Sequence, residues 1–397
     1  MISALYGEQI RLQDTIELSD EFRVFYILSQ STRMKRDDEE ISDHIGGSIL
    51  HIILFCILLQ QHFSSPDRNS LSIVEFDPIC NRAFPNFDWK LVLSLMQQTI
   101  KQCCKEYLSR RNAIQSQKYK SYARSVFLDK PLLEIKGGQV VAPISNLIGR
   151  WVCYELQNIV MQINPTIARH VRFAYQDYIG IWLDELKNFG NVTTENNIST
   201  LEGDKVCDFL CQSEEAITLI EVKSSNTMPK YIIAESLQKH TLIKRICEGI
   251  NQLSRVAERV RAGNIDGINL GNRKLYGIVV VLGEVPGINS EFGKSTIINP
   301  QYARKYNIQD YELFDYMPQV MDNHAFERVC CYLSATNLSF RQLLAERDKH
   351  DYQKVGDWRG LIDTLRKDID LKYPSFVKSG TNRLREELDE VAKRIRQ

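Results

Sequence analysis

Three charged residues that could carry out chemistry stand close together in the segment 206–225, which reads VCDFLCQSEEAITLIEVKSS. Asp208 lies within a short apolar stretch, and Glu221 and Lys223 end the next one. Side chains alternate along a strand, so Glu221 and Lys223 should share one face while Val222 points to the other. A tight hairpin with its turn at 212–215 would bring Asp208 beside Glu221.

Carboxylates at the end of an apolar strand pair are costly unless they are paired or bind a metal. Two carboxylates that lie together repel each other, and a hard divalent cation removes that conflict because it prefers oxygen ligands. The neighbouring Lys223 could orient a water molecule or neutralise charge on a phosphate. We therefore predict a Mg²⁺ or Mn²⁺ site formed by Asp208 and Glu221, with the backbone carbonyl of Val222 as a further ligand. Such a site is suited to phosphodiester hydrolysis.

This pattern resembles the PD-(D/E)XK, or restriction-endonuclease-like, superfamily. Asp208 matches the motif aspartate, Glu221 the acidic position and Lys223 the lysine, while Cys207 stands where the family commonly has proline. The resemblance covers roughly residues 130–285 and includes the order of elements: a helix, a loop or strand, the motif hairpin, a long helix and a strand.

The resemblance implies an α/β fold with a restriction-endonuclease-like mixed-sheet core flanked by helices. It also implies two accessory residues: Glu155, on the preceding helix, as a further metal ligand, and Gln252, on the following helix, as a helper near the site. The implied activity is that of a metal-dependent nuclease acting on nucleic acid, DNA rather than RNA. The implied setting is bacterial or phage, as in restriction or antiviral defence.

The chain divides into three expected regions: a helical region at 1–128, the nuclease core at 129–300 and a second helical region at 301–397. Strands are expected in a hairpin at 131–144, which turns at Lys136-Gly137-Gly138, and at 206–211, 216–222 and 275–283. Helices are expected at about 145–162, 234–261 and within 310–350.

Near the C-terminus, apolar residues recur at the helical steps of a short coiled coil: Leu384, Leu388, Val391 and Ile395. This seam could join the chain to a second copy, a larger oligomer or a partner subunit, or it could pack on the chain's own body. A seam of only two heptads does not distinguish association with another chain from packing on the chain's own body.

The 397 residues contain 50 basic and 50 acidic side chains, a balance that argues against a wholly cationic nucleic-acid coat but not against a local basic groove. The run from Lys101 to Arg124 is rich in Lys and Arg and includes Tyr107, Tyr119 and Tyr122. Such a run could bind phosphates and stack bases, although a solvated helix face is the favoured interpretation.

The ten cysteines include no CxxC, which predicts reduced thiols, no structural zinc and a cytoplasmic location.

The most apolar stretch, Ile45 to Phe63, approaches the length of a membrane span. Polar residues interrupt or end it, and no Lys or Arg lies directly beside it. We therefore expect a buried core helix and no membrane partner.

Two further strings invite a functional reading. Asp129 to Lys136 repeats the D…ExK spelling, but its gap is too short for a hairpin, so ordinary turn chemistry is favoured. The loop Gly287–Ser295 resembles a phosphate loop, yet five residues separate its glycines where four are needed.

Two alternatives to a nuclease follow. One is a catalytically inactive nucleic-acid-binding or scaffolding module, with Glu221 and Lys223 as a structural ion pair. The other, less favoured, is a nucleotide-binding regulator that uses Lys294.

Overall fold

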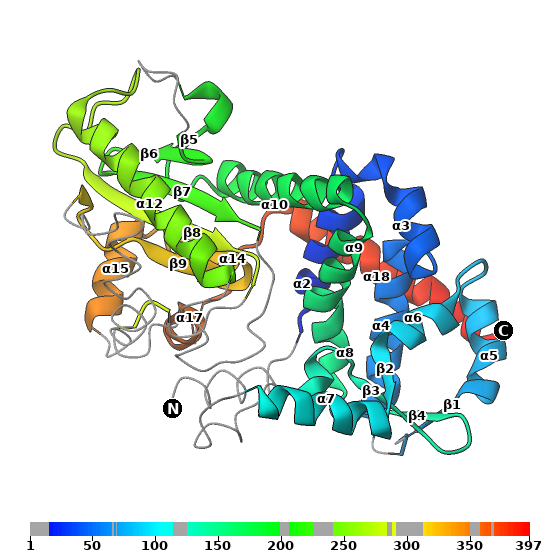
Figure 1. Cartoon of the computed structure of the whole chain (residues 1–397). Coiled ribbons are helices and arrows are strands. Elements are labelled where there is room, and N and C mark those ends of the chain that lie inside the picture. The colour runs from blue at the N-terminus through cyan, green and yellow to red at the C-terminus, as the bar shows by residue number, and fades with distance from the viewer. Residues whose placement is uncertain are drawn as a thin grey trace. The chain divides into compact units, whose positions relative to one another are not determined.

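The computed structural model describes residues 16–65, 67–68, 70–113, 125–198, 206–224, 241–283, 288–290, 313–349, 358–366 and 369–397. The chain forms two compact units (Figure 1). The first comprises Met1–Ala174, Lys230–Ile233 and Ser375–Gln397, and the second comprises Tyr175–Pro229 and Ala234–Pro374. This division differs from the three consecutive regions expected from the sequence, because segments distant in the chain fold together.

The second unit contains a five-stranded mixed sheet in the order β5-β6-β7-β8-β9. Its strands are β5 (Asn191–Thr194), β6 (Phe209–Gln212), β7 (Ala216–Lys223), β8 (Lys274–Val281) and β9 (Gln319–Asp322). The first three pair antiparallel, and β8 and β9 continue the sheet in parallel. The mixed α/β class and the three central strands are confirmed, whereas β5 and β9 were not expected. β9 lies beyond residue 300, in the region predicted to be helical.

One face of this sheet is covered by α12 (Thr241–Ala262), which lies in front of the strands in Figure 1. Odd-numbered residues of β7 and β8 point toward it, as strand alternation requires. The buried cluster there includes Ile217, Leu219, Val279, Val281, Ile246, Ile250 and Leu253. The described part of the helix predicted at 234–261 is thereby confirmed, and 234–240 lie outside the described residues.

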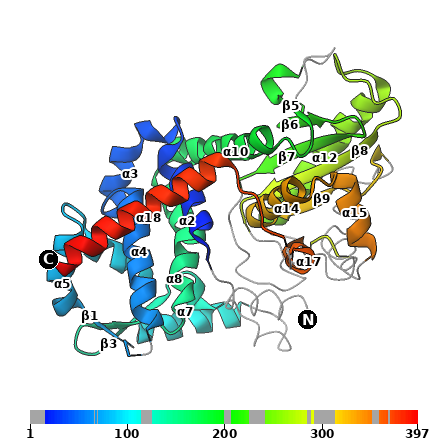
Figure 2. The ribbon, with the colours of Figure 1, turned by 180° about the vertical axis from the view of Figure 1, so that it is seen from behind.

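The opposite face carries α14 (Asn323–Thr336) and α15 (Phe340–Lys349), seen from behind in Figure 2, together with α17 (Trp358–Leu365). The ring of Phe340 meets that of Tyr276 on β8 at 5.8 Å between centroids. The helix α10 (Pro165–Leu186), which enters this unit at Tyr175, was not expected either. It packs closely on β6, because a Cβ at Gly180 would lie 3.0 Å from the Phe209 ring.

The first unit is mainly helical and holds a small four-stranded sheet in the order β1-β4-β3-β2. Its strands are β1 (Leu71–Ser72), β2 (Gln97–Thr99), β3 (Leu132–Ile135) and β4 (Gln139–Val141). Its helices are α2 (Leu18–Phe25), α3 (Asp38–Ile45), α4 (Ile49–Ser64), α5 (Ile73–Ala83), α6 (Trp89–Met96), α7 (Ile100–Asn112), α8 (Asn146–Arg150), α9 (Leu156–Ile163) and α18 (Ser375–Arg396), with the π-helical turn η5 (Trp151–Glu155) between α8 and α9. The hairpin predicted at 131–144 is present as β3 and β4. It belongs to this sheet and not to the five-stranded one.

The apolar stretch near the N-terminus forms α4, whose residues Ile49, Ile52–Cys56 and Leu59 are buried, as predicted for a core helix. Among the described residues, Asp38–Ser64 is the one segment long and apolar enough to cross a membrane, by length and composition only. Gly46, with φ +90°, ends α3 and divides that segment. The 16 residues of α4 span about 24 Å, less than the roughly 30 Å of a hydrocarbon core.

The C-terminal seam lies on α18 and packs within the first unit. Leu384 and Val391 are buried, at 0% and 3% exposure. The same helix approaches α2 so closely that a Cβ at Gly380 would clash with the Phe22 ring, and the rings of Phe22 and Phe376 lie 6.0 Å apart. Leu384 and Val391 therefore pack on the chain's own body, which is one of the two alternatives expected for this apolar seam.

Candidate functional site

The hairpin of β6 and β7 sets the register of the site. Phe209 pairs with Ile220, so Asp208, one residue earlier, stands opposite Glu221, one residue later. Ser213 closes the turn: its backbone N–H donates to the carbonyl of Ala216 at 2.9 Å, and its hydroxyl accepts from the Ala216 N–H at 3.1 Å. The prediction that a tight hairpin brings Asp208 beside Glu221 is confirmed.

Both oxygens of Asp208 accept hydrogen bonds. The Val222 N–H donates to Oδ2 at 2.6 Å, and the side-chain amide of Gln176 donates to Oδ1 at 2.8 Å. Gln176 lies on α10, and sequence reasoning missed it because it missed that helix. The signal was available, since buried residues of α10 recur at helical spacing after Pro165: Ile167, Val171, Ala174, Tyr178 and Trp182. Two donors from different elements fix the orientation of this carboxylate.

Glu221 is a buried carboxyl group, with 2% of its surface exposed. Its Oε1 accepts from Lys223 Nζ at 2.5 Å, while its buried Oε2 has no hydrogen-bond partner within the described part of the chain. Burial, and next the charge of Asp208, raise the pKa of Glu221 to about 8, although the Lys223 ammonium partly offsets both. Without a further cation, the site therefore favours a proton on this group.

Lys223 is positioned by α12. Its Nζ donates to Gln252 Oε1 at 3.3 Å, and the Gln252 amide donates in turn to the Val206 carbonyl at 2.9 Å. A Cβ at Gly249 would lie 3.4 Å from Lys223 Cε and 3.0 Å from Val279 Cγ1, so glycine allows the helix to approach the lysine stem closely. The predicted position of Gln252 beside the site is confirmed, and its role in catalysis stays a prediction.

The donors of this site suit a hard divalent cation. Asp208 and Glu221 present carboxylate oxygens, the ligands that Mg²⁺ and Mn²⁺ prefer, and among the described residues Oε2 of Glu221 has no hydrogen-bond partner, a place that such an ion would fill. Within the described ranges, no group of three or more His, Cys, Asp or Glu side chains gathers around a point that could hold a metal. The described part of the site thus offers two side-chain ligands, which water and the predicted Val222 carbonyl would supplement.

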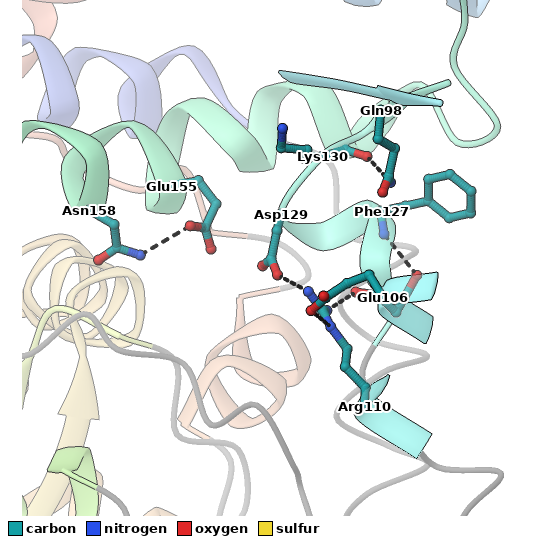
Figure 3. Close-up of polar contacts among 9 residues, drawn as sticks. Gln98, Glu106, Arg110, Phe127, Asp129, Lys130, Glu155 and Asn158 are labelled. Atoms are coloured by element: carbon teal, nitrogen blue, oxygen red, sulfur yellow. Dashed lines mark hydrogen bonds and ion pairs between the residues drawn. The ribbon is translucent and has the colours of Figure 1, made fainter. Parts of the chain in front are cut away.

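Glu155, the predicted accessory ligand, lies on η5 in the first unit, whereas Asp208 lies in the second. Its Oε2 accepts from the Asn158 amide at 3.3 Å (Figure 3). The structure does not bring Glu155 and Asp208 together within one unit, so its role stays a prediction. The residue of the preceding helix that does contact Asp208 is Gln176.

The two other strings have structural roles where they are described. Asp129 forms an ion pair with Arg110, as Figure 3 shows. In the loop Gly287–Ser295, residues 288–290 are described and buried. The Asn289 side chain donates to the Val320 carbonyl at 2.7 Å and accepts from the Val320 N–H at 2.8 Å, so it satisfies backbone groups of β9 at the edge of the sheet. Lys294 lies outside the described residues.

No family model matches this chain, and no curated protein or solved structure is significantly similar to it. The nuclease family, the activity and the metal are therefore proposals that rest on the residues and geometry around Asp208.

Proposed function

We propose that the second unit is a metal-dependent nuclease with a restriction-endonuclease-like core, hydrolysing phosphodiester bonds in DNA rather than RNA. One observation carries the proposal: the buried Glu221 has one oxygen without a hydrogen-bond partner in the described structure, and it stands opposite a second carboxylate and beside a lysine. Such a site is destabilising without a cation, and its parts are those of metal-assisted hydrolysis.

In this proposal Asp208 and Glu221 bind Mg²⁺ or Mn²⁺, and Gln176 and the Val222 N–H orient Asp208 for binding. The bound cation would polarise a phosphoryl oxygen and lower the pKa of a coordinated water. Lys223 has three N–H donors, of which Glu221 and Gln252 take two. The third can orient the attacking water or donate to a phosphate oxygen.

The second candidate is a catalytically inactive nucleic-acid-binding or scaffolding module in which Glu221 and Lys223 form a structural ion pair. The 2.5 Å contact between them favours it. It leaves the buried Glu221 oxygen without a hydrogen-bond partner among the described residues and does not explain why a second carboxylate, Asp208, faces it, and for that reason we place it second. The nucleotide-binding alternative gains no support, since Asn289, at the described start of its loop, pairs with β9. A cytoplasmic location and a role in restriction or antiviral defence extend the nuclease proposal.

The test is a cleavage assay with linear and circular duplex DNA, single-stranded DNA and RNA, each with Mg²⁺, Mn²⁺ or chelator. Asp208→Asn and Lys223→Ala should abolish cutting. A matched control is Lys274→Ala, which removes another strand lysine whose carboxylate partner, Asp315, lies 2.7 Å away. It should cut at the wild-type rate. Cutting that survives both site variants, or no cutting together with no metal binding by calorimetry, contradicts the proposal.

A further inference from the structure

The helix α7 in the first unit is fixed along one side. The side chain of Thr99 caps it, in a capping box with Gln102. Its buried Arg110 bonds to Glu106 at 2.9 Å, to the Ser125 carbonyl at 3.0 Å and to Asp129, as Figure 3 shows. In Figure 1 the helix lies beside the strands of the small sheet. The other side of α7 therefore has a fixed orientation.

That outer side is basic. Lys101, Lys105 and Arg111 are exposed, and none of them forms an ion pair with another described residue. The single acidic residue of the helix, Glu106, is paired with Arg110. At about 100° per residue, the three cations occupy roughly a third of the circumference of the helix. Their charges are thus uncompensated within α7.

Apolar and aromatic surface lies within and beside this basic arc: at about 100° per residue, Leu108 falls inside it, and Ile100 and Tyr107 fall within about 40° of its Arg111 edge. Ile100 is 55% exposed, Leu108 49% and Tyr107 39%, three of the six large hydrophobic residues most exposed in the described chain. Along the helix axis, Lys101 and Lys105 are about 6 Å apart, and Arg111 follows about 9 Å further on. Phosphates of one DNA strand rise about 3.4 Å per nucleotide, so such cations can meet every second or third phosphate.

We propose that this outer side of α7 is a docking surface for nucleic acid, formed by Lys101, Lys105, Arg111 and Tyr107. The inference rests on the proposed nuclease function and adds where its substrate is gripped. Charge complementarity selects a polyanion, the exposed apolar side chains can contact sugars, and the Tyr107 ring can stack on a base. Its phosphate contacts carry no base specificity, so duplex and single strand should both bind.

The test measures binding without cutting. Asp208→Asn protein in chelator is titrated with a fluorescent duplex DNA oligonucleotide and with its single strand, over a range of salt concentrations. In that background Lys101→Glu with Lys105→Glu is compared with Lys35→Glu and Lys378→Glu. The control pair is also exposed, lies in the same unit and changes the net charge equally. A milder pair, Lys101→Gln with Lys105→Gln, and thermal unfolding of every variant separate binding from folding.

The α7 pair should weaken duplex binding about tenfold or more and reduce the slope of log K against log salt by about 1.8, since each phosphate contact contributes about 0.9. The control pair should leave both nearly unchanged. Equal losses in the two pairs overturn the inference, as does unchanged binding in the folded α7 variants. Binding to anionic lipid vesicles that depends on α7, while DNA binding does not, also overturns it. A chain that binds DNA through α7 yet neither cuts nor binds metal refutes the nuclease proposal alone.

Discussion

Replacing Glu221 with glutamine should raise the stability of the metal-free protein while it abolishes metal binding and cutting. Glutamine has the shape of glutamate and keeps an oxygen that can accept from Lys223, but it carries no charge. The two effects have opposite signs because the charged form of Glu221 is costly in the folded chain: burial and Asp208 both disfavour it.

The magnitude follows from the raised pKa. A carboxyl group that shifts from 4.5 to about 8 on folding loses on the order of 4 kcal/mol of stability at pH 8, compared with an unshifted group. The contact with Lys223 needs no separate correction, because its lowering effect is already contained in the raised pKa. We expect Glu221→Gln to gain on the order of 4 kcal/mol at pH 8, and to gain almost nothing at pH 4.

The sign of the pH dependence is set by proton binding. The folded protein holds a proton on Glu221 between pH 4.5 and about 8, where the unfolded chain has lost it. Wild-type stability contributed by this group is therefore present at low pH and falls as pH rises through that window. The glutamine variant lacks this fall.

The assay is chemical unfolding of both proteins from pH 4 to pH 8, with chelator and then with excess Mg²⁺. At a Mg²⁺ concentration about 100 times its Kd, the wild-type protein should gain about 2.7 kcal/mol, and the variant nothing. Lys274→Gln is the control for loss of a charged strand residue. The reasoning is refuted if Glu221→Gln instead loses about 3 to 5 kcal/mol at pH 8, the loss expected when one partner of a buried structural ion pair is removed.

Three further outcomes are expected. Gln176→Ala should weaken Mg²⁺ binding about 10- to 100-fold, because it removes one of the donors that orient Asp208, with unfolding nearly unchanged; calorimetry that gives wild-type affinity contradicts this role. Gly190→Ala should cost more than about 2 kcal/mol in urea unfolding, since φ is +95° and a Cβ would lie 1.9 Å from the Gln212 carbonyl oxygen; a neutral change would show that the turn relaxes. In the first unit, burial raises the pKa of Glu21 to about 8. Glu21→Gln should therefore increase the free energy of unfolding by on the order of 3 kcal/mol at pH 7 and by almost nothing at pH 4. Equal gains at both pH values would exclude the raised pKa as the cause.

The hairpin and its face assignment could be predicted because they depend on local information. The alternation in β7 and the short gap after β6 fix which residues share a face, and Asp208 opposite Glu221 follows from them. β5 and β9 carry little such information. Each has four residues, and β5, Asn191–Thr194, is polar throughout apart from Val192.

The partition of the chain could not be predicted in the same way. The strands β3 and β4 were recognised as a hairpin, but which sheet a hairpin joins depends on packing between segments far apart in sequence. Their neighbours, β1 and β2, come from residues 71–72 and 97–99. Likewise, α18 packs on α2 across most of the chain length.

The contact of Gln176 with Asp208 illustrates the limit for the site. The family resemblance favours an acid on the preceding helix, and Glu155 was the acid available in the helix that the sequence revealed. The helix that packs on β6 is α10, and the side chain that reaches Asp208 from it is a neutral amide. Spacing can reveal α10, but only the packing of helix on sheet determines which of its side chains reaches the strand end.

The neutral Gln176 side chain also affects the net charge of the site, and that charge helps to compare the nuclease with the inactive binding module. Asp208, Glu221 and Lys223 carry a formal charge of −1 when ionised, and Gln176 and Gln252 add none. Without a metal, the proton favoured on Glu221 brings the sum to zero, so this strand end has no net charge that would attract a phosphodiester. A divalent cation changes the sum to +1, which attracts the phosphate and gives the Glu221 oxygen a partner. Under the nuclease proposal one ligand, a divalent cation, thus accounts both for the facing carboxylates and for the buried Glu221 oxygen, whereas the structural ion pair accounts for neither.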